Sequence, residues 1–283
     1  MIRSFEHAEF PLDLLLERKR QSLSVVLPAR EVADTVGQVV ERILSLDGLV
    51  DQVLVVDADS EDGSADIAQR AGAEVRQQGE LLPELGPVLG KGDALYRSLA
   101  AVRGDLVMFI DADTRDFEPH FVTGLAGPLI AGEGVRFVKA AYRRPFVTEG
   151  VEVPDGGGRV SQLTARPLLS AFYPDLAGLR QPLAGEVAAA REVLDRLPFS
   201  TGYAVETAML IDVRDVVGAA AIAQVDVGER RNFHQPLEAL RPMADTVLAA
   251  VCERLRREGR LVDGLSPGAI VERPPFAPVR AAA

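Results

Sequence analysis

The amino-acid sequence predicts an α/β fold in which a mostly parallel sheet carries helices on both faces. Three short, mainly apolar runs in the first 113 of the 283 residues alternate with segments of helical periodicity. A strand that is apolar along its length is typical of a parallel sheet, because it is buried on both faces. The alternating order of strands and helices places the helices over the sheet.

The sheet is predicted to begin with two strands joined by a helix. A strand over residues 22–27 is stopped by Pro28. Apolar residues recur at helical spacing over residues 34–46, which predicts a helix. A second buried strand follows over residues 52–56.

The next elements lead to a long loop. We expect a short helix over residues 64–71 and a brief strand over residues 74–76. Residues 79–90 contain three glycines and two prolines, and a loop of this length in a compact domain usually has a function. A helix is predicted to follow over residues 92–102.

The strand at the centre of the predicted sheet, residues 106–110, runs directly into two acids, Asp111 and Asp113. Open α/β sheets bind their ligands at the carboxyl ends of the strands, where these acids would lie. Alternation along a strand would point the two side chains to opposite sides. One acid could therefore hold a divalent metal while the other holds a sugar or ribose.

The second part of the chain has a less regular order of elements. A helix is expected over residues 117–132 and a strand over residues 135–141, followed by a flexible loop over residues 150–158 that opens a helix. Short helices and strands fill residues 165–228. A long amphipathic helix covers residues 237–258.

Composition excludes several classes of partner. The net charge of −11 argues against nucleic acid, whose phosphates require a basic surface, and disfavours anionic membranes. The single cysteine, Cys252, rules out an internal disulfide and fits a reducing compartment. No run approaches the roughly 18 apolar residues of a spanning helix, and acids interrupt any signal-like stretch at the N-terminus. We expect a soluble cytoplasmic protein.

Three polar clusters are expected at the carboxyl edge of the sheet. They are Pro28–Glu31 after the first strand, Asp57–Ser60 after the second and Gly90–Asp93 at the start of a helix. Lys91 stands between two glycines, so it can approach a diphosphate closely while backbone donors and the helix dipole assist. The GxxxxGK(S/T) spacing of a P-loop is absent.

Three later segments also carry groups suited to ligands. Three glycines precede Arg159 and Ser161, so open amides, a guanidinium and a hydroxyl could receive a phosphate or carboxylate at a helix start. Glu206 lies in an otherwise apolar helix, where a carboxylate needs a partner or a ligand. The segment Gly228–Gln235 is dense in donors and metal-ligand types.

Several of these segments together resemble a known enzyme family. The set is PAR-E, VVDADS, GKGDAL, FIDAD, VKAAYRRP, GGGRVSQLTARPLL, QPLAGE, GYAVE and HQPL. It resembles the glucosyl-3-phosphoglycerate synthases, which are retaining glycosyltransferases, and the closely similar mannosyl-3-phosphoglycerate synthases. The resemblance runs from about Val25 to Leu248.

The resemblance implies a GT-A fold with a Rossmann-like nucleotide-binding half and a mixed α/β acceptor-binding half. We therefore divide the chain into an N-terminal lead-in (1–22), a nucleotide-sugar-binding half (23–116), an acceptor-binding and helical half (117–265) and a flexible C-terminal tail (266–283). The resemblance also implies a homodimer, for which the helix over residues 237–258 is the expected contact.

The resemblance further implies which residues bind the nucleotide sugar. Residues 28–32 match the segment that packs on the base, Asp111 and Ala112 the ribose side of the DXD motif, and residues 203–206 the donor-sugar segment. Asp113, Glu206 and Lys91 are the expected catalytic residues. With Asp57 added from its cluster, the donor-binding residues are Pro28, Ala29, Arg30, Glu31, Val32, Asp57, Lys91, Asp111, Ala112, Tyr203, Ala204, Val205, Glu206 and Arg230.

A divalent metal, Mg²⁺ or Mn²⁺, is the implied cofactor, and Asp113 matches the metal-binding acid. The late loop of the family is often R-x-H-R-N, so an ungapped alignment with Arg230–His234 exchanges the histidine and the asparagine. Imidazole is the better ligand, and we therefore assign the metal to Asp113 and His234. The acceptor-binding residues are then Gly157, Gly158, Arg159, Val160, Ser161 and Asn232.

We expect the protein to transfer a hexose from a nucleotide sugar to the 2-hydroxyl of 3-phosphoglycerate with the anomeric configuration retained. UDP-glucose is the first choice of donor and GDP-mannose the alternative, because the loop after the first strand departs from the PALNEE frequent in the family. A sugar-phosphate nucleotidyltransferase is a second class, but it normally has a glycine-rich loop soon after the first strand, and residues 30–36 contain no glycine. A catalytically inactive binding protein is the third.

Overall fold

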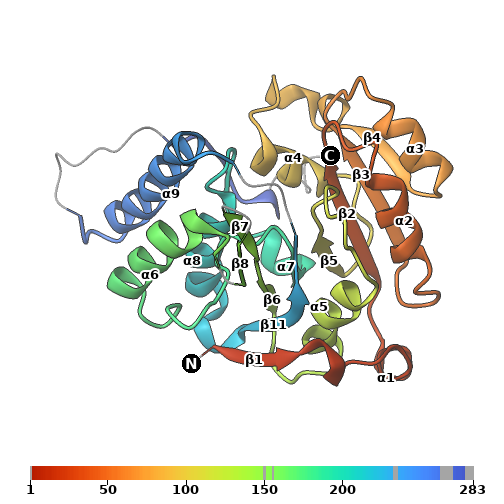
Figure 1. The fold of residues 1–283 in the computed structure, drawn as a ribbon, viewed down its shortest axis with the longest axis horizontal. Helices are drawn as coiled ribbons and strands as arrows, with labels where there is room; N and C mark the ends of the chain where they lie inside the picture. The colour runs from red at the N-terminus through yellow and green to blue at the C-terminus, as the bar shows by residue number, and fades with distance from the viewer. Residues whose placement is uncertain (1, 149–150, 155, 232–234, 262–269, 278–283) are drawn as a thin grey trace.

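The computed structural model describes residues 2–148, 151–154, 156–231, 235–261 and 270–277. At its centre is an eight-stranded sheet of order β1-β11-β6-β9-β5-β2-β3-β4 (Figure 1). Neighbouring strands are parallel, except that β9 is antiparallel to both β5 and β6. The strands are β1 (Arg3–Glu6), β2 (Leu23–Ala29), β3 (Gln52–Asp57), β4 (Glu74–Gln77), β5 (Leu106–Phe109), β6 (Phe137–Arg143), β9 (Val187–Ala190) and β11 (Ile222–Glu229). The mostly parallel sheet that the sequence predicts is confirmed.

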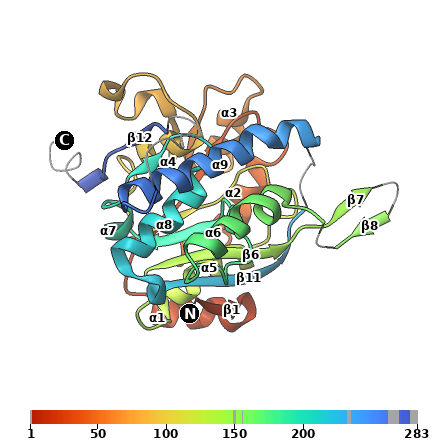
Figure 2. The same cartoon turned by 90° about the vertical axis from the view of Figure 1, so that its left-hand side faces the viewer.

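Two groups of helices lie on opposite sides of the molecule. Figure 1 shows α2 and α3 on one side of the molecule and α6, α8 and α9 together on the other, and Figure 2 looks onto this second group. The predicted long amphipathic helix is confirmed as α9. The helices are α1 (Leu12–Arg18), α2 (Val36–Leu44), α3 (Ser64–Arg70), α4 (Lys91–Ser98), α5 (His120–Ile130), α6 (Arg166–Phe172), α7 (Arg191–Leu194), α8 (Val205–Val217) and α9 (Leu237–Arg257).

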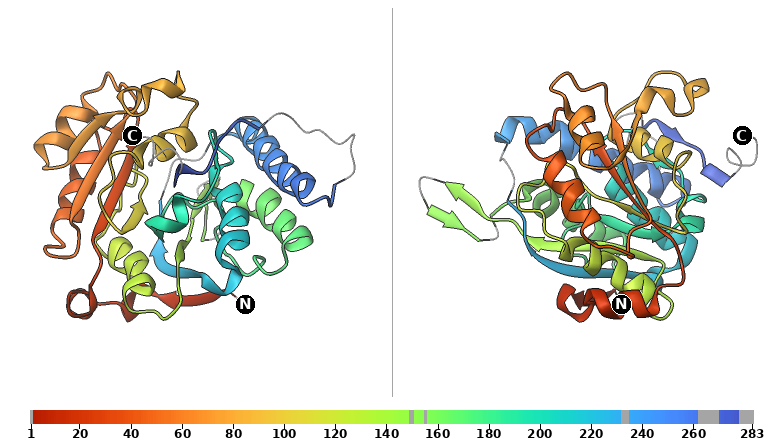
Figure 3. Two further views of the ribbon diagram at one scale, coloured as in Figure 1. Left: turned by 180° about the vertical axis from the view of Figure 1, so that it is seen from behind. Right: turned by 90° about the vertical axis from the view of Figure 1, so that its right-hand side faces the viewer.

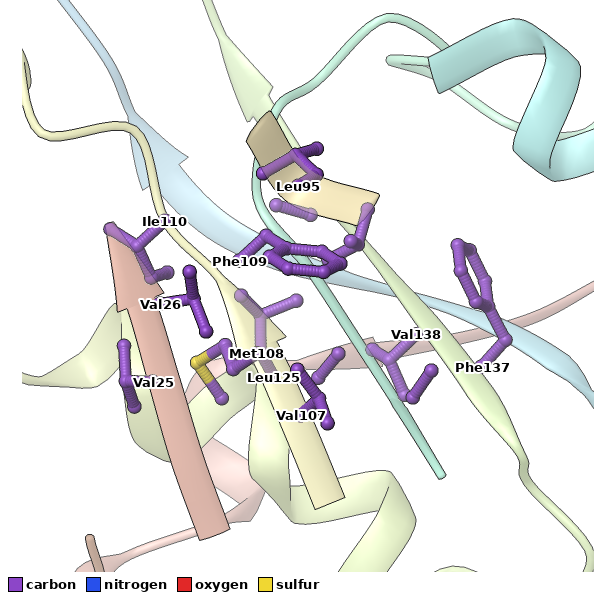
Figure 4. Close-up of a cluster of buried hydrophobic side chains, with 14 of the residues drawn as sticks. Val25, Val26, Leu95, Val107, Met108, Phe109, Ile110, Leu125, Phe137 and Val138 are labelled. Atoms are coloured by element: carbon purple, nitrogen blue, oxygen red, sulfur yellow. The ribbon is translucent and has the colours of Figure 1, made fainter. Parts of the chain in front are cut away.

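The core is built around β5, which is buried on both faces as its sequence predicts. Met108 and Phe109 are each at most 1% exposed, and Leu95 of α4 and Leu125 of α5 are buried in the same cluster (Figure 4). Burying a side chain of this size contributes about 1.5–3 kcal/mol. This packing holds the carboxyl end of β5, and the acids that follow it, in a fixed position.

Strand β2 does not stop before Pro28, contrary to the sequence prediction. It continues to Ala29, and Pro28 pairs with Val56 of β3. On the other side, β2 pairs with β5 only as far as Val26. The missing N–H of Pro28 is therefore tolerated, because it lies beyond the ladder that β2 forms with β5.

Both ends of the chain contain strands that the predicted lead-in and flexible tail did not include. Residues 3–6 of the expected lead-in form β1, which pairs in parallel with β11 at one edge of the sheet (Figure 3). Residues 270–277 of the expected flexible tail contain β12 (Glu272–Arg273) and the buried Phe276. Both segments have apolar residues that the sheet or its helices bury, which a composition argument does not reveal.

The loop expected at residues 150–158 contains part of a hairpin. Strand β7 (Phe146–Thr148) pairs antiparallel with β8 (Val151–Val153). Figures 2 and 3 show this hairpin extending from the body of the molecule. Among the described helices, none is both long and apolar enough to cross a membrane.

Candidate active site

Lys91 lies between two carboxylates that come from distant parts of the chain. Its Nζ is 2.7 Å from Oδ1 of Asp111, just after β5, and 2.9 Å from Oε1 of Glu206, in the first turn of α8. Burial works against the charge on Lys91, but the two carboxylates outweigh it and raise its pKa. Lys91 is therefore a permanent cation in this site.

Two glycines allow Lys91 to take this position. A Cβ on Gly92 would clash with the carbonyl oxygen of Ser200, and Gly90 has a φ of 103°, which favours glycine. The amide of Asp93 donates to the carbonyl of Thr201 at 3.0 Å. The start of α4 is thus packed directly on the backbone of residues 200–201.

Glu206 confirms the argument that a carboxylate in an apolar helix needs a partner. Its side chain is 8% exposed, and its Oε1 accepts from Lys91. Its Oε2 is buried and has no hydrogen-bond partner in the described part of the chain. A free buried acceptor at this position is suited to a ligand hydroxyl.

Arg230 contacts both Asp111 and Asp113. Its side chain is 4% exposed, and its guanidinium lies 3.2 Å from Oδ2 of Asp111 and 3.0 Å from Oδ1 of Asp113. The expectation that the two acids point to opposite sides is therefore wrong. Strand β5 ends at Phe109, so its alternation does not extend to the acids.

The charges around Asp111 keep it ionised. Burial alone would raise its pKa, but Lys91 and Arg230 outweigh this effect and lower the pKa well below its usual range. Gly185 lies against the same carboxylate, because a Cβ at this glycine would clash with it. Asp111, whose side chain is 20% exposed, thus lies between two cations and a backbone segment, whereas the side chain of Asp113 is 62% exposed.

Sequence reasoning missed Glu186 as part of the site. This residue precedes β9, is fully buried, and pairs with Arg230 while the hydroxyl of Tyr142 donates to its Oε2 at 3.0 Å. Burial raises the pKa of Glu186, and Arg230 opposes the rise. The QPLAGE segment contained the signal, since a lone acid before an apolar strand needs a buried partner.

Lys139 of β6 is a second buried cation that the sequence did not single out. It is 1% exposed, and its Nζ donates to the carbonyl of Ala184. Burial lowers its pKa to about 8, with Glu206 acting in the opposite direction. Its position inside an apolar strand sequence hides it from pattern reasoning.

The loops after β2 and β3, which were both expected to bind the donor, are joined by hydrogen bonds. Asp57 is fully buried and accepts from the backbone and hydroxyl of Ser60 at 2.9 and 2.7 Å. Oε1 of Glu31 accepts from the backbone of Glu61 at 2.9 Å, while Arg30 is exposed. Asp57 therefore shapes the turn after β3 through both of its oxygens.

The glycine segment at residues 156–158 differs in one respect from the sequence prediction. The amide of Gly157, expected to bind phosphate, donates to the carbonyl of Arg144 at 2.8 Å. Nε of Arg144 is buried and has no hydrogen-bond partner among the residues that the structure describes. Arg144 is thus a cation beside this segment that the sequence analysis did not assign.

Arg159 and its neighbours form the start of the next helical segment. The Arg159 guanidinium lies 5.1 Å over the ring of Phe146 and donates to the carbonyl of Gln235. Val160 and Ser161 are buried. The predicted acceptor residues 158–161 therefore lie together, next to the hairpin and the segment that precedes α9.

The described residues fit a divalent cation at Asp113. A carboxylate that is more than half exposed beside a buried guanidinium offers the hard oxygen ligand that Mg²⁺ and Mn²⁺ prefer. Asn232 and His234 lie outside the described residues. Within residues 2–231, 235–261 and 270–277, apart from the short gaps at 149–150 and 155, no group of three histidine, cysteine, aspartate or glutamate side chains is arranged to hold a metal.

Comparison with known proteins identifies the family of this chain. Glycosyl transferase family 2 matches residues 24–150. The glucosyl-3-phosphoglycerate synthase of Mycolicibacterium smegmatis is 45% identical over 243 residues, which is 86% of this chain and 80% of that protein. The chain belongs to the glucosyl-3-phosphoglycerate synthase family.

Solved structures agree with this family and its GT-A fold. The glucosyl-3-phosphoglycerate synthase of Mycobacterium tuberculosis in complex with Mn²⁺, UDP-glucose and phosphoglyceric acid is 41% identical, with a TM-score of 0.86 over 98% of this chain and 99% of that one. The mannosyl-3-phosphoglycerate synthase of Rubrobacter xylanophilus is 49% identical, with a TM-score of 0.91 over 98% and 96%. The expected family and fold class are confirmed.

Proposed function

We propose that this protein transfers glucose from UDP-glucose to the 2-hydroxyl of 3-phosphoglycerate, with retention at the anomeric carbon, as a metal-dependent glucosyltransferase. The observation that carries this proposal is the position of Lys91 between Asp111 and Glu206, with Arg230 contacting both acids of the DXD segment. Cations and acids placed in this way can hold a diphosphate and the sugar attached to it.

Each side chain has a task in this reaction. Lys91 and Arg230 offset the negative charge that develops on the leaving diphosphate. The free Oε2 of Glu206 accepts a hydrogen bond from a hydroxyl of the sugar and orients it. Arg159, with the backbone at Gly158, receives the charged groups of the acceptor.

Asp113 holds the divalent cation in this proposal, together with His234. When bound, the cation supplies positive charge to the departing nucleotide diphosphate. Support comes from the exposed carboxylate of Asp113 and from the Mn²⁺ present in the structure of the M. tuberculosis relative. Asn232 is assigned to the acceptor.

A retaining reaction needs either a covalent intermediate or attack from the face that the leaving group occupies. Glu206 is the carboxylate that we assign to the sugar, but Lys91 holds one of its oxygens at 2.9 Å. We therefore propose same-face attack through an oxocarbenium-like state, in which Glu206 positions the sugar.

The proposal is tested by measuring nucleotide release with and without 3-phosphoglycerate. Release of UDP from UDP-glucose that requires both 3-phosphoglycerate and a divalent metal supports it. Release of pyrophosphate from a nucleoside triphosphate and a sugar phosphate would indicate a nucleotidyltransferase instead. Absence of turnover with every donor would indicate a binding protein.

Transfer of mannose from GDP-mannose is the second candidate, and the similarity to the R. xylanophilus mannosyl-3-phosphoglycerate synthase favours it. The same acceptor site serves both reactions, so the donor decides between them. A screen of UDP-glucose, GDP-glucose, UDP-mannose and GDP-mannose at one concentration of 3-phosphoglycerate compares kcat/KM directly. A higher value for GDP-mannose would replace the first proposal with the second.

We also propose that the enzyme is a cytoplasmic homodimer in which α9 contributes to the contact. Support for the dimer comes from the exposed apolar side chains of Leu237 and Leu248 on this helix. Dimers are the most frequent homo-oligomers. Light scattering should give a mass of about twice the 30.4 kDa of one chain. A concentration-independent mass of one chain would exclude the dimer.

A further inference from the structure

Residues 271–277, which we call the C-terminal strap, run back to the start of α4. Within the strap, β12 pairs antiparallel with β10 (Phe199–Ser200). Both the amide and the hydroxyl of Thr201 donate to the carbonyl of Val271, each at 3.0 Å. The strap is therefore a backbone-paired part of the fold.

The end of the strap is anchored by an aromatic contact. Phe276 is 2% exposed, and its ring meets that of Tyr96 of α4 edge to face at 5.2 Å. The guanidinium of Arg191 lies 5.7 Å over the same ring. The amide of Ala277 donates to the carbonyl of Asp195 at 2.7 Å. Contacts of this kind hold the residue between them, Arg273, close to α4.

Arg273 forms a two-pronged ion pair with Asp93. Its Nε and its terminal nitrogen lie 2.6 and 2.9 Å from the two carboxylate oxygens. Asp93 is fully buried and also accepts from the amide of Leu89 at 3.0 Å and from Nε of Arg97 at 3.2 Å. Asp93 thus connects the strap to the backbone on both sides of Lys91.

The strap is connected to the segment of Glu206 through β10. A single turn of chain separates Ser200 from α8, whose second residue is Glu206. The pairing of β10 with β12 holds this stretch on one side, and the packing of Gly92 against Ser200 holds it on the other. The distance between Lys91 and Glu206 therefore depends on the start of α4, on β10 and on the start of α8, which the strap joins.

We propose that the C-terminal strap positions the donor site, and that Arg273 is the residue through which it holds Lys91 and Glu206 at their working distance. Arg273 is a positioning residue, because it acts through Asp93 and does not reach the substrate itself. The inference rests on the proposed function, in which Lys91 and Glu206 bind the nucleotide sugar.

The test compares Arg273→Gln with the wild type and with Arg257→Gln. Arg257 pairs with Glu272 on the same strand but does not contact Asp93, so it is a matched control. For Arg273→Gln we expect the KM for UDP-glucose to rise by about tenfold or more, as for the loss of one partner of a buried pair. The KM for 3-phosphoglycerate and the values for Arg257→Gln should stay within about twofold of the wild type.

A merely structural role predicts a different result. It would lower the fraction of folded enzyme. The apparent kcat would then fall, while the KM for UDP-glucose would not change. Arg273→Lys keeps the charge but loses the planar fork, so it should recover part of the donor affinity. If Arg273→Gln does not fold, the KM of Arg273→Lys decides, and an unchanged value for the donor would overturn the proposal.

Hydrogen exchange separates this inference from the proposed function. In Arg273→Gln, amides of residues 89–94 and 199–206 should exchange faster, whether or not the protein uses UDP-glucose. If the wild type is inactive but the variant still exchanges faster in these segments, the proposed function alone is rejected. If the wild type forms the expected product but exchange in these segments is unchanged in the variant, the positioning role of the strap is rejected and the proposed function stands.

Discussion

At the scale of single residues, Arg230 determines the electrostatics of the site. It is buried and contacts Asp111, Asp113 and Glu186, so three acids share one guanidinium. Burial raises the pKa of Glu186. The pKa of Asp111 is lowered, because Lys91 as well as Arg230 lies beside its carboxylate. Asp113, whose side chain is 62% exposed, is the acid of this group to which we assign the cation in the proposed function.

Asp113→Ala should lower kcat by about 100-fold or more, the size of effect found when one electrostatic group is removed from an active site. Its side chain is 62% exposed, so the melting temperature should change little. Steady-state assays and thermal unfolding measure both. Asp116→Ala, an exposed acid three residues on, serves as the control. Activity of Asp113→Ala that persists in EDTA would contradict the metal-dependent mechanism.

Arg159→Ala should raise the KM for 3-phosphoglycerate and leave UDP-glucose binding nearly unchanged. Loss of a charge-assisted pair typically costs about 2–5 kcal/mol, or roughly 30-fold and more in kcat/KM. Arg159→Lys should recover only part, because a point charge does not match a phosphate as the planar fork does. Arg166→Ala, whose partner is Gln162, is the matched control. An equal loss for both substrates would move residues 157–161 into the donor site.

Lys139→Met should change how stability depends on pH. The pKa of Lys139 is about 8 in the folded protein against 10.5 for an ordinary lysine. Between these two pH values the Lys139 side chain is protonated in the unfolded chain but largely deprotonated in the folded protein. Raising the pH through this window therefore stabilises the wild type relative to the variant by about 1.4 kcal/mol per unit. Urea unfolding at pH 7, 8, 9 and 10 measures the difference, which should be constant below pH 8. A constant difference from pH 8 to 10 would show that Lys139 is not perturbed.

At the scale of elements, the start of α4 and strand β10 form one unit. Lys91 and Asp93 are two residues apart, and each is held by side chains from other elements, Asp111 and Glu206 for the first and Arg273 for the second. Gly92 between them packs on the carbonyl of Ser200. Lys91 is therefore positioned by backbone contact as well as by charge.

Gly92→Ala should displace α4 from β10. Its Cβ would clash with a backbone carbonyl that cannot rotate away, and overpacking of this kind costs about 1–3 kcal/mol. We expect a lower melting temperature together with a loss of activity larger than the stability loss explains. Gly79→Ala, which meets no neighbouring atom, should have neither effect. A fully active Gly92→Ala enzyme would show that the close contact is not needed.

At the scale of the whole molecule, one sheet joins the two halves of the chain. Strand β9 from the second half lies between β5 and β6 and pairs with both. The boundary predicted near residue 116 therefore does not separate two independent cores. Figure 4 shows residues from both sides of this boundary, such as Val107 and Val138, in one cluster.

The full chain should consequently unfold in a single transition. Near- and far-ultraviolet circular dichroism should report the same midpoint in urea. A fragment of residues 23–116 should not fold alone, because β5 would lose its pairing with β9 and α4 its packing on β10 and Phe276. A cooperative transition of the isolated fragment would contradict this view.

The sequence alone determined the parallel core, the family and most residues at the carboxyl edge of the sheet. Continuous apolar runs and helical periodicity are local patterns, and they located β2, β3, β5, α2 and α9 to within a few residues. The acids after β5, Lys91 between its glycines and Glu206 in an apolar helix were predicted for the same reason, since each is unusual within its own segment.

The tertiary structure alone decided which of these groups meet and what else joins them. Lys139 and Arg273 lie in ordinary sequence surroundings, and only folding brings them to their partners, the carbonyl of Ala184 and the buried carboxylate of Asp93. The amide of Gly157 and the carboxylate of Asp57 were predicted to bind ligands. In the structure the amide donates to the carbonyl of Arg144, and the carboxylate accepts from the amide of Ser60. Burial and pairing across the chain are long-range properties, because a charge requires a partner only once the fold has removed it from water.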